Sequence, residues 1–233
     1  IFFSFSFSQF NWADDGVPVR QGYHIEWYRG GDISIENEMI VVWSDTRLGT
    51  RDVYAQKINL NGDLLWDEEG ILVTGNLGRQ EDPIIIADNM GGGFISWRSY
   101  ENSPINGEIY IQHINSTGAL SWGEKMISGD IPVKILTGQN MCSDRQGGVY
   151  VTWYEDGGDY YGVHVDGDGT YTLPEILIDT EDTFGNVSLE SAGNGNAVIA
   201  WKEGSASTSN IYSQRIGVMN NSIINKCLWV KSE

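Results

Sequence analysis

The stretch that decides the fold runs from Trp66 to Trp97 and reads WDEEGILVTGNLGRQEDPIIIADNMGGGFISW. Its two tryptophans are 31 residues apart. The same interval recurs between two other pairs of tryptophans, Trp12 with Trp43 and Trp122 with Trp153. Counting the same interval back from Trp201 reaches Thr170, so one copy has lost its first tryptophan. Tryptophan is too rare for such spacing to arise by chance, and the chain is therefore built from repeats.

A tyrosine follows the second tryptophan of each interval, in an acidic or amide context. These tyrosines are Tyr54, Tyr110, Tyr161 and Tyr212. The resulting repeat is about 48 to 56 residues long, a period that indicates a solenoid, a propeller or an array. We expect repeat units at about 12–65, 66–121, 122–169 and 170–228.

Each unit reads as short strands separated by turn signals. In the second unit the expected strands are 83–87, 94–97, 108–114 and 120–122, the last continuing at 126–127. Residues 64–66 of the first unit correspond to 120–122. No segment has a sustained apolar period of about 3.6 residues, so helix should be nearly absent. Four strands per unit, with glycine-rich hairpins and aromatics at fixed places, predict an all-β propeller of about four blades.

The repeated aromatic residues are expected to be structural. A four-stranded sheet buries neither of its faces alone, so each blade must stack on its neighbours. The strand tryptophans then pack between blades, and the alternative is a ring of exposed sugar-binding aromatics. The structural set comprises Trp12, Trp43, Trp66, Trp97, Trp122, Trp153, Trp201, Tyr54, Tyr110, Tyr161 and Tyr212.

The two ends of the chain compete for one place in the fold. Residues 1–10 form an apolar, Phe-rich leader or strand, and residues 11–233 form a single propeller domain. Residues 10–19 resemble an outermost strand that comes before any inner strand in the chain. Such a strand would close the last blade of the same chain or a blade of a neighbouring subunit. The apolar residues 227–230 are a second candidate for that place. A leader of this kind points outside the cytoplasm, either as the tail of a signal peptide or as a strand.

Composition excludes several classes of partner. The chain of 233 residues has 14 basic and 32 acidic residues and a net charge of -18. Binding to nucleic acid or to an anionic membrane surface needs clustered Lys and Arg, so neither is expected. No apolar run reaches the roughly 18 residues needed for a membrane span. Cys142 and Cys227 do not make a disulfide framework, and the sequence leaves open whether they pair.

Several runs resemble a known family. They are Trp43 to Arg47, Arg51 to Ile58, Asn61-Gly62, Leu65-Trp66 and Gly78 to Pro83. Together they are similar to the N-terminal propeller repeats of large secreted proteins from Bacteroidetes-type bacteria, which carry a sorting domain for type IX secretion. The resemblance covers about residues 9–216. It implies a propeller on a secreted or cell-surface protein, and it implies no particular activity.

Candidate chemistry is sparse in this sequence. Acidic residues recur beside the strand tryptophans and tyrosines, and we interpret them as turn-capping groups. These residues are Asp45, Glu155, Glu203, Asp52, Glu108 and Asp159. An enzyme is not expected, because glycoside hydrolysis needs a cleft with two close carboxylates and no spacing singles out a pair.

Metal sites are also not expected, with one weak exception. Residues 166–169 read Asp-Gly-Asp-Gly, which predicts a hairpin turn, with weak calcium binding as the alternative. No other cofactor is expected. His24, His113 and His164 are far apart in sequence, so they should not form a zinc cluster.

Positions that break the repeat are the better functional candidates. His24, Trp27, Tyr28 and Arg29 stand where the second unit has mostly aliphatic residues. They predict a recognition patch for a protein or glycan ligand, or an altered inner strand that plugs the ring centre.

We therefore expect a secreted or cell-surface, non-catalytic binding or scaffold module. One alternative is a subunit that self-assembles into a homo-oligomer or filament by exchanging its N-terminal strand. The other alternative is a glycan-active propeller enzyme.

Overall fold

The computed structural model describes eleven segments of the chain, and regular structure within them consists of strands alone. The described residues are 16–20, 26–33, 37–75, 78–101, 107–129, 140–154, 159–172, 174–178, 187–204, 209–219 and 222–227. The expectation that helix is nearly absent holds for these segments. No helix in them is long and apolar enough to cross a membrane.

Within the described segments, sixteen strands form four antiparallel sheets, each with its four strands in chain order. Blade 1 contains β1 (Glu26–Ile33), β2 (Met39–Asp45), β3 (Asp52–Ile58) and β4 (Ile71–Thr74). Blade 2 contains β5 (Gln80–Ala87), β6 (Gly93–Ser99), β7 (Glu108–Ile114) and β8 (Lys125–Met126). Blade 3 contains β9 (Asn140–Ser143), β10 (Val149–Tyr154), β11 (Tyr160–Val165) and β12 (Glu175–Ile178). Blade 4 contains β13 (Ser188–Gly193), β14 (Asn196–Gly204), β15 (Ser209–Met219) and β16 (Ser222–Cys227).

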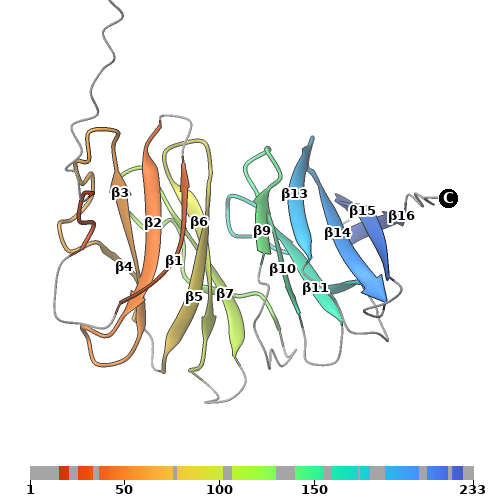
Figure 1. Cartoon of the computed structure of the whole chain (residues 1–233), viewed down its shortest axis with the longest axis horizontal. Coiled ribbons are helices and arrows are strands. Elements are labelled where there is room, and N and C mark those ends of the chain that lie inside the picture. The colour runs from red at the N-terminus through yellow and green to blue at the C-terminus, as the bar shows by residue number, and fades with distance from the viewer. Residues whose placement is uncertain are drawn as a thin grey trace, which may run out of the picture.

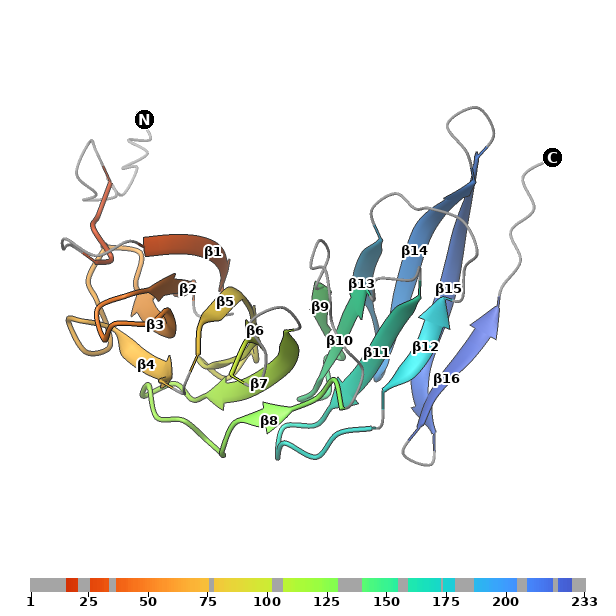
Figure 2. The ribbon, with the colours of Figure 1, turned by 90° about the horizontal axis from the view of Figure 1, so that it is seen from below.

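The blades stand side by side with their first strands lining one side of an arc (Figures 1 and 2). Figure 2 shows blade 1 and blade 4 at opposite ends of that arc. Apolar clusters fill each of the three interfaces between consecutive blades. This packing is the main source of stability, because a single four-stranded sheet cannot bury its own faces. The prediction of an all-β propeller with four four-stranded blades is confirmed.

Each blade carries one stacked tryptophan–tyrosine pair on its second and third strands. Trp97 and Tyr110 are direct cross-strand partners, with ring centroids 6.0 Å apart. The equivalent pairs are Trp43 with Tyr54, Trp153 with Tyr161, and Trp201 with Tyr212. Trp97 and Trp153 are fully buried. The structure therefore places these tryptophans at packing positions, and Trp97 and Trp153 cannot belong to an exposed sugar-binding ring.

Trp66 and Trp122 lie between strands, which corrects the strands expected at 64–66 and 120–122. Only an isolated bridge forms in each stretch, at Leu64 and at Leu120. The ladder stops at Trp66 because its backbone N donates to the Gln56 side chain at 3.2 Å, and both indoles reach across to the next blade. Nε1 of Trp66 donates to the Ser116 carbonyl at 3.2 Å, and Nε1 of Trp122 donates to the Gly167 carbonyl at 3.2 Å.

The last blade receives its fourth strand from the C-terminal part of the chain, as β16. Of the expected strand at 10–19, the described part lies against blade 1. Val17 packs on Gly62, and Val19 packs against a buried cluster that includes Trp43 and Tyr54. Trp12 and the leader at 1–10 lie outside the described residues, so the exchange of an N-terminal strand stays a prediction.

Candidate functional site

A cavity of about 410 Å³ opens where the first strands of all four blades end. We call it the axial cavity, because the innermost strand of every blade contributes to it. Its lining residues lie at or near the hairpin turns that join the first and second strands of the blades. Ligand sites in proteins are commonly hollows of roughly 300 to 1,000 Å³ with a few convergent polar groups. The polar residues that line it are Asp32, Asn89, Ser143, Arg145, Glu190 and Ser191.

Two carboxylates break the repeat at one position of this lining. The residue eleven positions before the strand tryptophan is Ile86 in blade 2 and Cys142 in blade 3, but Asp32 in blade 1 and Glu190 in blade 4. All four residues line the axial cavity. The next position along each strand also lines it, with Ile33, Ala87, Ser143 and Ser191. The cavity is therefore a property of the repeat, and its two acids are departures from it.

The carboxylate of Asp32 is fixed in place by two backbone donors. One oxygen accepts a hydrogen bond from its neighbour Ile33 N at 2.8 Å. The other accepts from Ala87 N at 2.9 Å, which ties blade 1 to blade 2. Each carboxylate oxygen can accept two hydrogen bonds, so Asp32 keeps acceptor capacity for a ligand.

Glu190 is an exposed side chain on β13. Its charge acts on Cys142 in the neighbouring blade. Burial, together with the charges of Glu190 and Asp144, raises the pKa of the Cys142 thiol to about 12. Cys142 therefore stays protonated and is a poor nucleophile.

Arg145 adds the cationic group of the cavity lining. It occupies a turn position with φ 60°, and the corresponding turns carry Asn37, Asn89 and Asn194 with φ between 53° and 61°. Asparagine tolerates this left-handed conformation well, whereas arginine does not. The turn at Arg145 is therefore less favourable in backbone conformation than the three turns with asparagine, and it places a guanidinium at the cavity. Sequence reasoning missed Asp32, Arg145 and Glu190, although aligning the units on their strand tryptophans would have exposed Asp32 and Glu190.

The predicted recognition patch is only partly described. Trp27, Tyr28 and Arg29 lie on β1, whose backbone is described there but whose side chains are not. His24 lies outside the described residues. The axial cavity is at the opposite end of β1, next to Asp32 and Ile33. The patch stays a prediction.

His113 and His164 occupy equivalent places in blades 2 and 3, where each contacts an aspartate in the turn between the first two strands of its blade. We call these two histidine–aspartate pairs the histidine latches. Nε2 of His113 lies 2.9 Å from Asp88 Oδ2, and Nε2 of His164 lies 2.9 Å from Asp144 Oδ2. Each carboxylate also accepts backbone hydrogen bonds within its own turn. Among the described residues, no three His, Cys, Asp or Glu side chains are grouped as metal ligands.

Residues 166–169 form the hairpin turn that the sequence predicts. Gly169 N donates to the Asp166 carbonyl at 2.9 Å, and Asp166 N donates to the Thr170 carbonyl at 2.8 Å. The side chain of Asp168 accepts from Thr170 N at 2.8 Å. The same turn occurs at 59–62 and 115–118, so the stretch has a structural role in the repeat.

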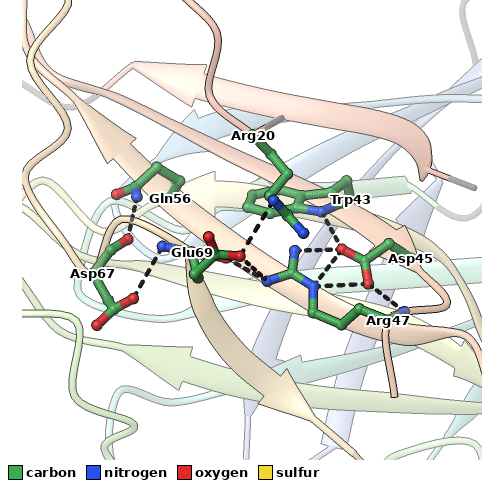
Figure 3. Close-up of polar contacts among 7 residues, drawn as sticks. All are labelled: Arg20, Trp43, Asp45, Arg47, Gln56, Asp67 and Glu69. Carbon is green, nitrogen blue, oxygen red and sulfur yellow. Dashed lines mark hydrogen bonds and ion pairs between the residues drawn. The ribbon is translucent and has the colours of Figure 1, made fainter. Parts of the chain in front are cut away.

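A second acidic pair, Asp45 and Asp52, lies at the other end of blade 1. Asp45 pairs with Glu26, at the end of β1 away from Asp32. Figure 3 shows Asp45 receiving hydrogen bonds from Trp43 and Arg47, while Arg47 also reaches Glu69. Burial disfavours the charged Asp45, but these hydrogen bonds outweigh it and lower its pKa. This arrangement agrees with the turn-capping role expected for Asp45.

Comparison with known proteins gives a fold and no family. No protein-family model matches the chain, and no curated protein matches it in sequence. A protein of unknown function from Dyadobacter fermentans aligns with 85% of this chain and 67% of its own, at 12% identity and a TM-score of 0.53.

Two solved enzymes are similar at a lower level. An endo-arabinase from Bacteroides thetaiotaomicron aligns with 82% of this chain and 75% of its own, at 13% identity and a TM-score of 0.47. A sucrose-6-phosphate hydrolase from Lactobacillus gasseri aligns with 87% of this chain at 11% identity and a TM-score of 0.46. The chain spans about half the length of that hydrolase, namely 49%. These likenesses concern the fold alone.

The prediction that the chain is not an enzyme is wrong as an exclusion. It rested on the view that no spacing singles out two carboxylates, whereas Asp32 and Glu190 occupy the same position of the repeat and line one cavity. The fold and the site together define a four-bladed propeller with a polar, carboxylate-bearing axial cavity.

Proposed function

We propose that this chain is an extracellular propeller that binds a glycan in its axial cavity and hydrolyses a glycosidic bond there. The observation that carries the proposal is the replacement of Ile86 and Cys142 by Asp32 and Glu190 at the same repeat position of blades 1 and 4. Glycoside hydrolysis typically uses two carboxyl groups on either side of the scissile bond.

The two acids differ in a way that suits two roles. Asp32 is held rigidly by the backbone of β1 and β5, so it is placed to act on the anomeric carbon, as nucleophile or as base for a water molecule. Glu190 is exposed on the innermost strand of the last blade, where a bound glycan would cover it, and it takes the role of the acid that protonates the oxygen of the leaving sugar. The glycosidic C–O bond breaks, and the leaving oxygen takes the proton of Glu190. Water adds its hydroxyl to the anomeric carbon, and the remaining proton of that water goes to a carboxylate of the site.

The remaining lining residues fit a polyhydroxylated ligand. Asn89 and Ser143 offer both donors and acceptors for sugar hydroxyls, and Arg145 offers donors only. A net charge of -18 disfavours polyanionic substrates, so a neutral glycan is the favoured class. The extracellular location rests on the apolar leader at 1–10 and on the resemblance to secreted propeller repeats.

The test is a hydrolysis assay on the full chain. Neutral polysaccharides and aryl glycosides are supplied, and released reducing sugar or aryl alcohol is measured. We expect activity in the wild-type protein and a loss of about 100-fold or more in kcat for Asp32→Asn and for Glu190→Gln. Glu203→Gln, on β14 and outside the cavity lining, is the matched control and should keep full activity.

Two results would overturn the proposal. One is hydrolysis that both cavity variants retain in full. The other is a wild-type protein that neither hydrolyses nor binds any member of the panel. Thermal unfolding of each variant shows whether a loss of activity reflects a loss of fold.

A further inference from the structure

A second hollow of about 350 Å³ lies between blades 3 and 4, beside the axial cavity. We call it the side cavity. The turn at 144–148 separates the two, because Ser143 and Arg145 line the axial cavity while Asp144 and Gln146 line the side cavity. The β13–β14 hairpin also lines both hollows, because Ser191 lines the axial cavity and residues Asn194 to Asn196 line the side cavity.

The side cavity contains a histidine whose second ring nitrogen is open. Nε2 of His164 is bonded to Asp144, but its Nδ1 lies 3.7 Å from Asp166 Oδ1, which is too long for a hydrogen bond. In blade 2, the equivalent Nδ1 of His113 lies 2.7 Å from the hydroxyl of Ser121. His164 has no such partner in the described part of blade 3, because the Thr172 hydroxyl instead accepts from His164 N at 3.0 Å. The imidazole is nevertheless buried, with a side chain 8% exposed.

The groups around this nitrogen form a polar lining. The Asp166 carboxylate is 61% exposed, and Gln146 and Asn194 lie on the other sides of the hollow. With Nε2 donating to Asp144, Nδ1 is an acceptor for a hydroxyl proton. Acceptors and amide groups on several sides suit the alternating hydroxyls of a sugar ring. Among the described residues that line this hollow there is no Lys or Arg, and two are aspartates, which disfavours an anion.

We propose that the side cavity is a second sugar subsite, so that the substrate is an extended oligosaccharide lying across the turn at 144–148. This inference rests on the proposed function of the axial cavity. Consecutive residues of one turn line both hollows, so adjoining units of one chain can occupy them together. A monosaccharide bound in the axial cavity would leave the side cavity empty.

The test compares ligands of increasing length. Binding of glucose, xylose, mannose and arabinose, and of their neutral oligosaccharides of two to six units, is measured by calorimetry on the full chain. We expect at least one series in which affinity rises tenfold or more from the monosaccharide to the tetrasaccharide. The double variant Asp166→Ala with Gln146→Ala should lose that gain and keep monosaccharide binding. Both residues are exposed, and the hairpin uses the backbone of Asp166.

Asp63→Ala, an exposed acid beside the corresponding turn of blade 1, is the control and should leave the gain intact. Affinity that is independent of length, or a gain that the double variant retains, overturns the second subsite. If such length-independent binding is lost in Asp32→Asn, the proposed function survives while this inference fails. Absence of binding by every sugar overturns both.

Discussion

Asp45 and Asp52 face each other as direct cross-strand partners on β2 and β3, yet they have opposite environments. Asp45 is hydrogen-bonded by Arg47 and Trp43, whereas neither carboxyl oxygen of Asp52 has a partner in the described part of the chain. Asp52 is 1% exposed. Burial and the charge of Asp45 raise the pKa of Asp52 to about 6.

This pair makes stability depend on pH. The pKa of Asp52 is higher in the folded chain than the usual value near 3.9, so the free energy of unfolding should fall as pH rises from about 4 to about 6. Asp52→Asn removes the charge and should be more stable than wild type by about 1 to 3 kcal/mol at pH 7.5, with little difference at pH 3.5. Urea unfolding at both pH values measures this. A stabilisation of the same size at both would contradict the assignment, and the exposed Glu68→Gln is the control.

The glycine contacts between blades give a second prediction. Gly169 has φ +82°, and an added Cβ would lie 3.0 Å from the Trp122 indole. Gly193 has φ +74° with no atom within 4 Å of such a Cβ. Both alanine variants carry the backbone strain of about 1 kcal/mol, but Gly169→Ala should lose about 1 to 3 kcal/mol more through overpacking. Chemical denaturation of both variants checks this, and equal losses would show that the indole does not constrain the turn.

Much of the fold could be predicted from the sequence because hairpin register fixes which residues face each other. Trp97 and Tyr110 sit on neighbouring strands joined by one loop, so their recurrence reports a recurring sheet. Trp66 was misplaced because it ends a short apolar run, residues 64–66, that follows an Asn-Gly turn and so resembles a strand, while its indole bonds to the next blade. Nothing local in the sequence encodes that contact between blades.

The candidate site was harder to predict for a related reason. Asp32 and Glu190 come from the first and last blades, and only the arrangement of the four inner strands along one side of the arc brings both to the lining of one cavity. Each residue alone reads as an ordinary polar group near a turn. The comparison that reveals them is between units, at the position eleven residues before each strand tryptophan.

A third prediction concerns the histidine latches. Burial disfavours the charged Asp144, but hydrogen bonds from His164 and from the backbone of Gln146 and Gly148 outweigh it and lower its pKa. Its contribution to stability should be present above pH 4 and be lost as pH falls further. Asp144→Asn should therefore cost about 1.5 to 3 kcal/mol at pH 7 and less at pH 3.

The equivalent variant in blade 2, Asp88→Asn, provides an internal check on this latch. The pKa of Asp88 is lowered in the same way, with His113 and the backbone of Met90 and Gly92 outweighing burial. Unfolding curves of the two variants should show the same pH dependence. Losses that do not change with pH in either one would speak against the latch.

A fourth prediction concerns the buried thiol of Cys142. Its pKa of about 12 follows mainly from burial, with the charges of Glu190 and Asp144 adding to it. In a Cys227→Ser variant at pH 8, we expect a thiol reagent to label Cys142 only after unfolding in denaturant. Rapid labelling of the native chain would mean that the interface between blades 3 and 4 is open.

The most direct test of the central claim is a crystal structure of Glu190→Gln soaked with the oligosaccharide that binds best. The account predicts a sugar unit in the axial cavity, with a hydroxyl or its anomeric carbon next to the Asp32 carboxylate and a hydroxyl within hydrogen-bond distance of Arg145. An axial cavity without sugar, in crystals where the same oligosaccharide is bound elsewhere on the chain, would contradict it.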